Sequence, residues 1–194
     1  MKIRDSGMPG EETWNTFFDA PRTLRELDFE SMTGDVVDFG CGYGTFSIAA
    51  AQLTTGTVYA LDIDAQMVDA TAARANELGL TNVKAIARDF SAEGTGLPHS
   101  SVAYAMLFNI LHAENPVGLL HEAFRVLQPG GVLVIIHWIG GDTPRGPPPD
   151  IRPRPEQCRA WARQVGFVLP RPVVSLPPYH YGLAVRKPPY PRGE

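Results

Sequence analysis

The stretch Val36-Val37-Asp38-Phe39-Gly40-Cys41-Gly42-Tyr43-Gly44 decides the fold, because it predicts a buried strand that runs directly into a glycine loop. Glycine adopts positive φ without a steric penalty and lets a ligand lie close to the backbone. The next run, 45–53, predicts a helix whose first amide groups face the loop and favour an anionic group. Together these elements are typical of a nucleotide-binding strand–loop–helix unit.

The spacing of the glycines separates two classes of nucleotide site. A dinucleotide fingerprint reads G-x-G-x-x-G, which an NAD-linked oxidoreductase would require, whereas this loop reads G-x-G-x-G. Asp38, Gly40, Gly42 and Gly44 instead resemble motif I of the class I S-adenosylmethionine-dependent methyltransferases, in particular the type 11/25-like small-molecule family. The resemblance implies S-adenosyl-L-methionine as cofactor and S-adenosyl-L-homocysteine as product. It also implies that these four residues bind the cofactor, with Asp38 near the methionine amino group.

Two further acidic residues follow predicted strands in the order that the family shows. Asp62 ends the second strand, where a carboxylate lies beside the ribose of a nucleotide bound on the first loop. Asp89 and Phe90 follow the third strand and match the positions that contact the adenine amino group and a ring nitrogen. Ile63 would contact the adenine face. Without the resemblance, Asp62 would only end a strand and Asp89 would be an isolated acid.

The remaining pattern extends the resemblance over about residues 35–137. A fourth strand is predicted at 102–108, and Leu127-Gln128-Pro129-Gly130-Gly131 precedes a fifth, as in the same family. The order of elements implies an α/β, doubly wound, Rossmann-like sheet of seven mostly parallel strands, with an antiparallel last strand and helices on both faces. We expect a single domain overall, with residues 1–34 as an N-terminal helical lid segment and 35–194 as the cofactor-binding methyltransferase domain.

The acceptor should meet the cofactor at the carboxyl ends of the fourth and fifth strands, where α/β sheets bind ligands. Asn109 and His112 follow the fourth strand, and His137 and Trp138 end the fifth. We expect Asn109, His112 and His137 to be catalytic candidates on the acceptor side, and Asn109 also to contact the cofactor. His112 reads either as a general base near physiological pH or as a helix-capping or loop histidine.

Three aromatic residues are candidate walls of the substrate pocket: Trp14, Phe17 and Trp138. The segment that carries the first two reads either as a lid or as a helix packed on the core. A second long loop, 140–153, is rich in Gly, Pro and Arg, and its length is typical of a lid. Its Arg145 and Arg152, with Arg154, could receive an acidic substrate or lie in solvent. The histidine and tyrosine at 179–180 are weaker acceptor-side candidates.

Composition narrows the classes of function. The chain has 194 residues and a net charge of −4, so it lacks the basic footprint of a nucleic-acid-binding protein. Its two cysteines have no zinc spacing, and no metal is expected. No signal-peptide core or membrane span is visible, which favours a cytoplasmic protein. The sequence predicts an enzyme with a small-molecule acceptor of unknown identity; the alternative is a non-catalytic cofactor-binding sensor or partner subunit. It does not decide the oligomeric state.

Overall fold

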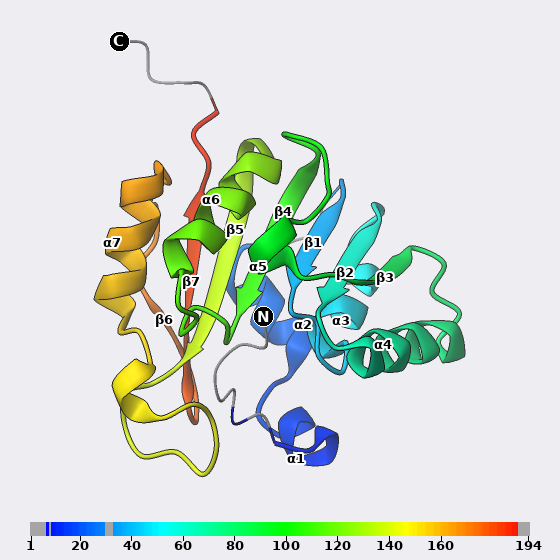
Figure 1. The fold of residues 1–194 in the computed structure, drawn as a ribbon, viewed down its shortest axis with the longest axis horizontal. Helices are drawn as coiled ribbons and strands as arrows, with labels where there is room; N and C mark the ends of the chain where they lie inside the picture. Colours follow the sequence, from blue (N-terminus) through cyan, green and yellow to red (C-terminus); the bar gives the residue numbers. More distant parts are fainter. Residues whose placement is uncertain (1–6, 8, 30–32, 190–194) are drawn as a thin grey trace.

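The computed structural model describes residues 7, 9–29 and 33–189, and these contain one sheet of seven strands (Figure 1). The strands are β1 (Val36–Phe39), β2 (Val58–Asp62), β3 (Val83–Ala87), β4 (Val102–Phe108), β5 (Leu127–Trp138), β6 (Val174–Leu176) and β7 (His180–Arg186). Their order is β3-β2-β1-β4-β5-β7-β6. Strands β1 to β5 run parallel, and β7 is antiparallel to both of its neighbours. The predicted fold class is confirmed.

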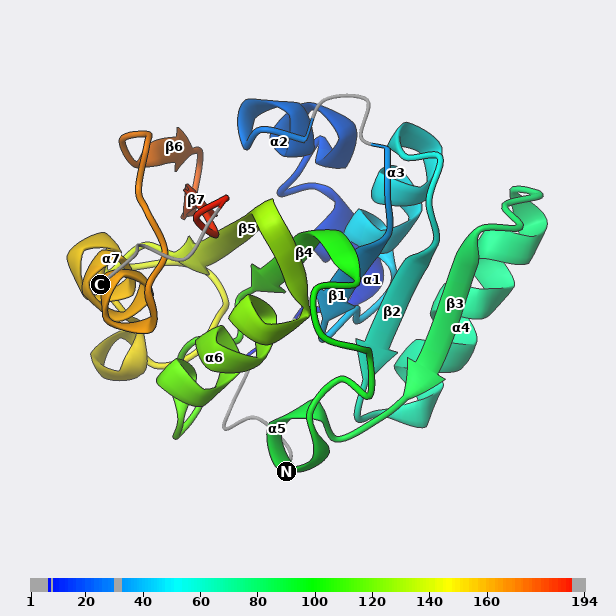
Figure 2. The same cartoon turned by 90° about the horizontal axis from the view of Figure 1, so that it is seen from above.

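Helices cover both faces of the sheet (Figure 2). They are α1 (Glu11–Asn15), α2 (Ala20–Glu26), α3 (Thr45–Leu53), α4 (Ala65–Glu77), α5 (Phe90–Glu93), α6 (Pro116–Val126) and α7 (Pro155–Val165), with a 3₁₀ turn η1 (Pro149–Ile151). Helices α1, α2 and α3 bury Trp14, Leu24 and Phe46 in one apolar cluster. Helices α6 and α7 bury Leu120 and Cys158 in the cluster on the opposite face. Among the described residues, no helix is long and apolar enough to cross a membrane.

The central strand β4 explains why this chain forms a parallel sheet. All seven of its residues are buried, and its sequence is apolar without alternation, as expected for a strand covered by helices on both faces. Its Tyr104 hydroxyl donates a hydrogen bond to the carbonyl of Leu27, 3.0 Å away, directly after α2. This contact anchors the end of the N-terminal segment to the middle of the sheet. The predicted lid segment is only partly visible, because residues 1–6, 8 and 30–32 lie outside the described residues.

Helix α4 buries Val68, Thr71 and Ala75. It ends at Glu77, and its C-cap residue Leu78 is 51% exposed. Between β3 and β4 the chain forms the four-residue helix α5 and then a loop.

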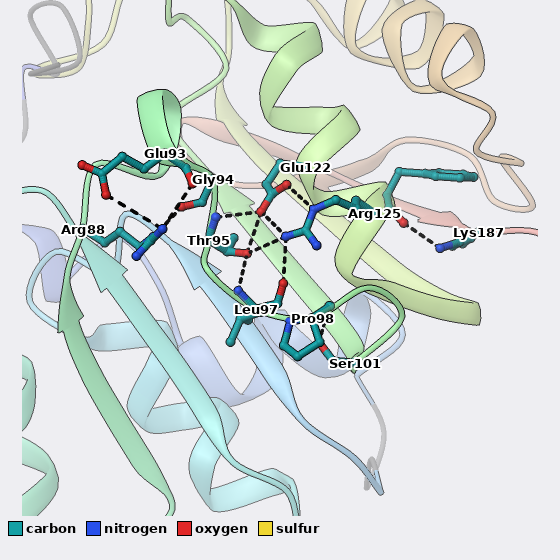
Figure 3. A network of polar contacts seen from close by, with 11 residues as sticks. Arg88, Glu93, Gly94, Thr95, Leu97, Pro98, Ser101, Glu122, Arg125 and Lys187 are labelled. Atoms are coloured by element: carbon teal, nitrogen blue, oxygen red, sulfur yellow. Dashed lines mark hydrogen bonds and ion pairs between the residues drawn. The ribbon is translucent and has the colours of Figure 1, made fainter.

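A polar network fixes the loop that replaces a full helix between β3 and β4 (Figure 3). The Glu122 carboxylate on α6 accepts hydrogen bonds from the Thr95 amide (2.7 Å) and hydroxyl (2.6 Å). Arg125 donates to the same carboxylate (2.7 Å) and also to the carbonyl of Leu97 (2.9 Å). Burial alone would raise the pKa of Glu122, but the hydrogen bonds from Arg125 and Thr95 outweigh it and lower the pKa to about 2. The ionised carboxylate therefore holds this loop on α6.

We predict that Glu122→Gln lowers the free energy of unfolding by about 1–3 kcal/mol at pH 7, because the four hydrogen bonds that this carboxylate accepts are weakened or lost. The folded-state pKa of Glu122 lies below its unfolded value of 4.5, so this stabilisation is complete above pH 4.5 and is lost as the pH falls toward 2. Urea unfolding at pH 7 and pH 3 measures it. Glu77→Gln, at an exposed position, is the control. An equal deficit at both pH values would contradict the assignment.

Candidate functional site

A cavity of about 310 Å³ lies at the carboxyl ends of β1, β2 and β4. The strand order changes direction between β1 and β4, which is where open α/β sheets bind ligands. Seven of the residues predicted to bind the cofactor line it: Asp38, Gly40, Gly42, Asp62, Ile63, Asp89 and Phe90. Asn109 and the pocket candidates Trp14 and Trp138 also line it. Gly44, Phe17, His112 and His137 do not belong to its lining.

The glycine loop forms the floor of the cavity. At two of its positions the backbone lies in the left-handed region, which favours glycine. Gly40 has φ +79°, and a Cβ there would lie 3.3 Å from Ile110. Gly44 has φ +77°, and a Cβ there would meet Thr71 at 2.8 Å. Gly44 therefore acts from behind the loop, by letting α3 and α4 approach each other. These positions leave main-chain atoms, and not side chains, facing the cavity.

Asp62 fastens this loop to the neighbouring strand. One carboxylate oxygen accepts a hydrogen bond from the Gly42 amide (2.9 Å), and the other accepts one from the Asp64 amide (3.0 Å). Each carboxylate oxygen can accept a second bond, so the group can still receive hydroxyl donors from a ligand in the cavity. This remaining capacity of Asp62 to accept hydrogen bonds fits the hydroxyl groups of a ribose.

Asp38 is a buried acid beneath the loop. It is 2% exposed and accepts a hydrogen bond from the Ser47 hydroxyl at 2.6 Å. Burial raises the pKa of Asp38 to about 7; the Ser47 bond opposes this shift and the charge of Asp62 adds to it. Because no lysine or arginine lies among the described lining residues, a cationic ligand group would favour ionised Asp38. Asp38 therefore fits the ammonium group of a methionine moiety, and the neighbouring charge of Asp62 adds to the attraction.

The opposite wall is apolar. Ile63 is 40% exposed at the cavity, whereas Phe90 is buried and packs edge-on against Phe39, with ring centroids 5.4 Å apart. Between them a flat ring would find apolar surface on both sides. One Asp89 oxygen accepts bonds from the Ser91 and Ala92 amides at 3.1 Å, so Asp89 also caps α5. These positions fit an adenine.

The far end of the cavity is aromatic, and sequence reasoning found only part of it. Its walls are Trp14, Phe46, Phe108 and Trp138. Phe46 and Phe108 were missed; the available signal was that one opens α3 and the other ends β4. Asn109 lies beside them with φ +56°, and neither amide atom of its side chain has a described partner. Backbone strain together with an unpaired buried amide is typical of a ligand-contacting position.

The histidine candidates lie away from the cavity lining. The Nδ1 of His112 is 3.3 Å from the Nε2 of His137, and both side chains are buried. Burial, and then the neighbouring His112, lower the pKa of His137 to about 3, so His137 is neutral at physiological pH. A catalytic role for either histidine remains a prediction.

Arg152 corrects an expectation about the loop 140–153. It was expected either to meet an acidic substrate or to lie in solvent, yet it is 6% exposed. Its guanidinium donates to the carbonyls of Pro147 (2.7 Å), Ile139 (3.0 Å) and Gly141 (3.1 Å). Arg152 therefore ties the loop to itself and to the end of β5. Its hydrogen-bond donors are therefore occupied by main-chain carbonyls of the protein itself.

Known proteins with similar sequences are methyltransferases. A family described as a methyltransferase domain matches residues 36–131. The chain is 37% identical over 101 residues to the ribosomal protein L11 methyltransferase of Dechloromonas aromatica, covering 52% of this chain and 31% of that protein. It is 32% identical over 119 residues to the aklanonic acid methyltransferase DauC of a Streptomyces species, covering 59% and 53%. The chain thus spans about a third to a half of these curated relatives.

A solved structure matches a larger share of both chains. It is a SAM-dependent methyltransferase from Aquifex aeolicus, with a TM-score of 0.77 and 28% identity. The match covers 88% of this chain and 90% of that one.

We predict that Asp38→Asn stabilises the ligand-free protein at alkaline pH. The folded-state pKa of Asp38, about 7, lies above its unfolded value of 3.8, so wild-type stability falls as the pH rises from about 4 to about 7. The amide side chain of the Asp38→Asn variant does not ionise, so the variant does not lose stability in this way. Between pH 5 and pH 8 its advantage over wild type should grow by on the order of 2–3 kcal/mol.

Thermal and urea unfolding at both pH values measure the effect, with the exposed Asp69→Asn as the control. A stability difference that does not change with pH would show that Asp38 is not the titrating group.

Proposed function

We propose that this chain transfers a methyl group from S-adenosylmethionine to a small-molecule acceptor. It belongs to the class I S-adenosylmethionine-dependent methyltransferases of the type 11/25 kind. One observation carries the cofactor site. A backbone cradle, two acids and an apolar slot come from three separate strand ends and line a single cavity.

In this proposal each part of the cavity has one task. Gly40 and Gly42 approach the methionine moiety by their backbone, and Asp38 compensates its ammonium charge. Asp62 accepts the ribose hydroxyls. The adenine lies between Ile63 and Phe90, with Asp89 near its amino group.

The cofactor, when bound, supplies a methyl carbon made electrophilic by its sulfonium. The protein therefore has to hold an acceptor in line with that carbon and to exclude water. Orientation of this kind contributes on the order of 7–11 kcal/mol in favourable cases. The aromatic walls Trp14, Phe108 and Trp138 restrict the acceptor and exclude water from that end. Asn109, with its free amide atoms, is the polar group placed to orient it.

The enclosure of the aromatic end supports a small acceptor. Helix α1 lies at the edge of the sheet toward which the parallel strands point, as does the loop 140–153 (Figure 1). Its Trp14 forms part of the cavity wall. We retain the proposal that residues 1–34 act as a lid over the domain formed by 35–194. The names of the relatives include a ribosomal protein and aklanonic acid, so a protein acceptor is the second candidate.

We predict that the wild-type protein binds S-adenosylhomocysteine with a micromolar Kd and that Asp62→Ala weakens binding by about 30-fold or more. The substitution removes a charged acceptor from the ribose and also releases Gly42; each hydrogen bond to a charged group contributes about 1.5–3 kcal/mol. Isothermal titration calorimetry measures both constants.

Asp69→Ala is the matched control, because Asp69 is an exposed acid on α4 outside the cavity lining. It should bind like the wild type. If the folded wild-type protein does not bind, the proposed function fails; if both alanine variants bind equally well, Asp62 is not the ribose ligand.

A further inference from the structure

His180, the first residue of β7, is a buried histidine without a described hydrogen-bond partner. It is 2% exposed, and neither ring nitrogen has a partner among the described residues. A buried polar group left unpaired costs about 1–3 kcal/mol, so its presence calls for a compensating role.

The surroundings of His180 are aromatic rings. Its ring centroid lies 4.1 Å from that of Trp138 and 4.5 Å from that of Phe18, with Phe17 and Trp14 slightly farther away at 6.2 and 6.3 Å. We call these five residues the aromatic chamber. Trp14 and Trp138 also line the cavity, so His180 packs against two of the residues that form its wall.

The segment that closes the chamber is held by few polar contacts. Helix α1 has five residues and no side-chain N-cap bond, and a helix this short is marginal by itself. Glu11 pairs with Arg74 on α4 at 3.0 Å, and both side chains are more than a third exposed. Asn15 accepts a hydrogen bond from the Thr45 hydroxyl at 3.1 Å on the exposed surface. Exposed polar contacts of this kind contribute little. The segment is therefore held mainly by the apolar packing of Trp14 and the two phenylalanines, which the aromatic surface of a bound acceptor could replace.

We infer that the aromatic chamber is the acceptor subsite and that His180 is its hydrogen-bonding group, reached when α1 and Phe17–Phe18 move aside. This inference rests on the proposed function and names its substrate class: an uncharged, flat aromatic compound that carries a hydroxyl donor. The rings fit a flat apolar acceptor, because aromatic pairs favour edge-on and offset contacts.

The charges around His180 agree with an uncharged acceptor. Burial, and then the Arg152 charge, lower the pKa of His180 to about 3, so its ring is neutral and offers one nitrogen as an acceptor. The Arg152 guanidinium carbon is 5.7 Å from the Trp138 ring centroid, but its donors are taken up by loop carbonyls. No cation is left in the chamber for a carboxylate.

The test uses protein saturated with S-adenosylhomocysteine and three probes followed by fluorine NMR: 4-fluorophenol, 4-fluoroanisole and 4-fluorobenzoate. The anisole has the same ring without the donor, and the benzoate adds a charge. We expect the wild type to bind 4-fluorophenol about 10-fold or more tightly than either other probe. His180→Phe should bind the phenol only as weakly as the anisole.

Two further readouts separate a role in binding from a structural one. His180→Phe replaces an unpaired polar ring with an apolar one, so its Tm without ligand should rise by about 2–6 °C. Its affinity for S-adenosylhomocysteine should stay within about twofold of wild type, because His180 lies outside the cavity lining. His180→Asn, which keeps a donor and an acceptor, should retain part of the preference for the phenol.

Equal phenol binding by wild type and His180→Phe would overturn the inference, as would benzoate binding as tightly as phenol. A lower Tm or a failure of His180→Phe to fold would also overturn it, because the histidine would then be stabilising. If wild-type protein fails to bind S-adenosylhomocysteine, it is the proposed function that fails, and that result is read before any probe is added.

Discussion

The hydrogen bond from the Gly42 amide to the Asp62 carboxylate, 2.9 Å long, is the contact on which the site depends. Three of the five residues in the loop after β1 are glycines, so its path is fixed largely through main-chain groups. Asp62 holds the amide of Gly42, and the Thr71 hydroxyl on α4 donates to its carbonyl at 3.0 Å. A single glycine is thereby held from β2 and from α4, and the loop becomes a rigid floor.

This constraint also sets the electrostatics of the cavity. Because Asp62 must approach the loop, its carboxylate lies close enough to Asp38 to help raise the pKa of that buried acid. One end of the cavity therefore favours a cation. The other end is bounded by Trp14, Phe46, Phe108, Trp138 and Asn109, and none of these five side chains is charged. In the proposed function the first end is the cofactor half of the cavity and the second end is the acceptor half.

The sequence could predict that the residues of the proposed cofactor half meet at one cavity, because each of its parts is local. Asp62 and Ile63 directly follow one strand, and Asp89 and Phe90 directly follow another, so placing the strands also places these side chains. The acceptor half depends on convergence in space. Phe46, Phe108 and His180 come from distant segments, and no spacing links them. His112 shows the limit most clearly, because Asn109 reaches the cavity while a residue three positions later packs against His137 instead.

The most direct test of the central claim is a ¹H–¹⁵N correlation spectrum of the protein titrated with S-adenosylhomocysteine. The backbone amide signals of Gly40, Gly42, Ile63 and Phe90 should shift together and saturate with one dissociation constant. These residues follow three different strands and line the same cavity. Shifts confined to one strand end, or shifts that leave the glycine loop unchanged, would contradict the account.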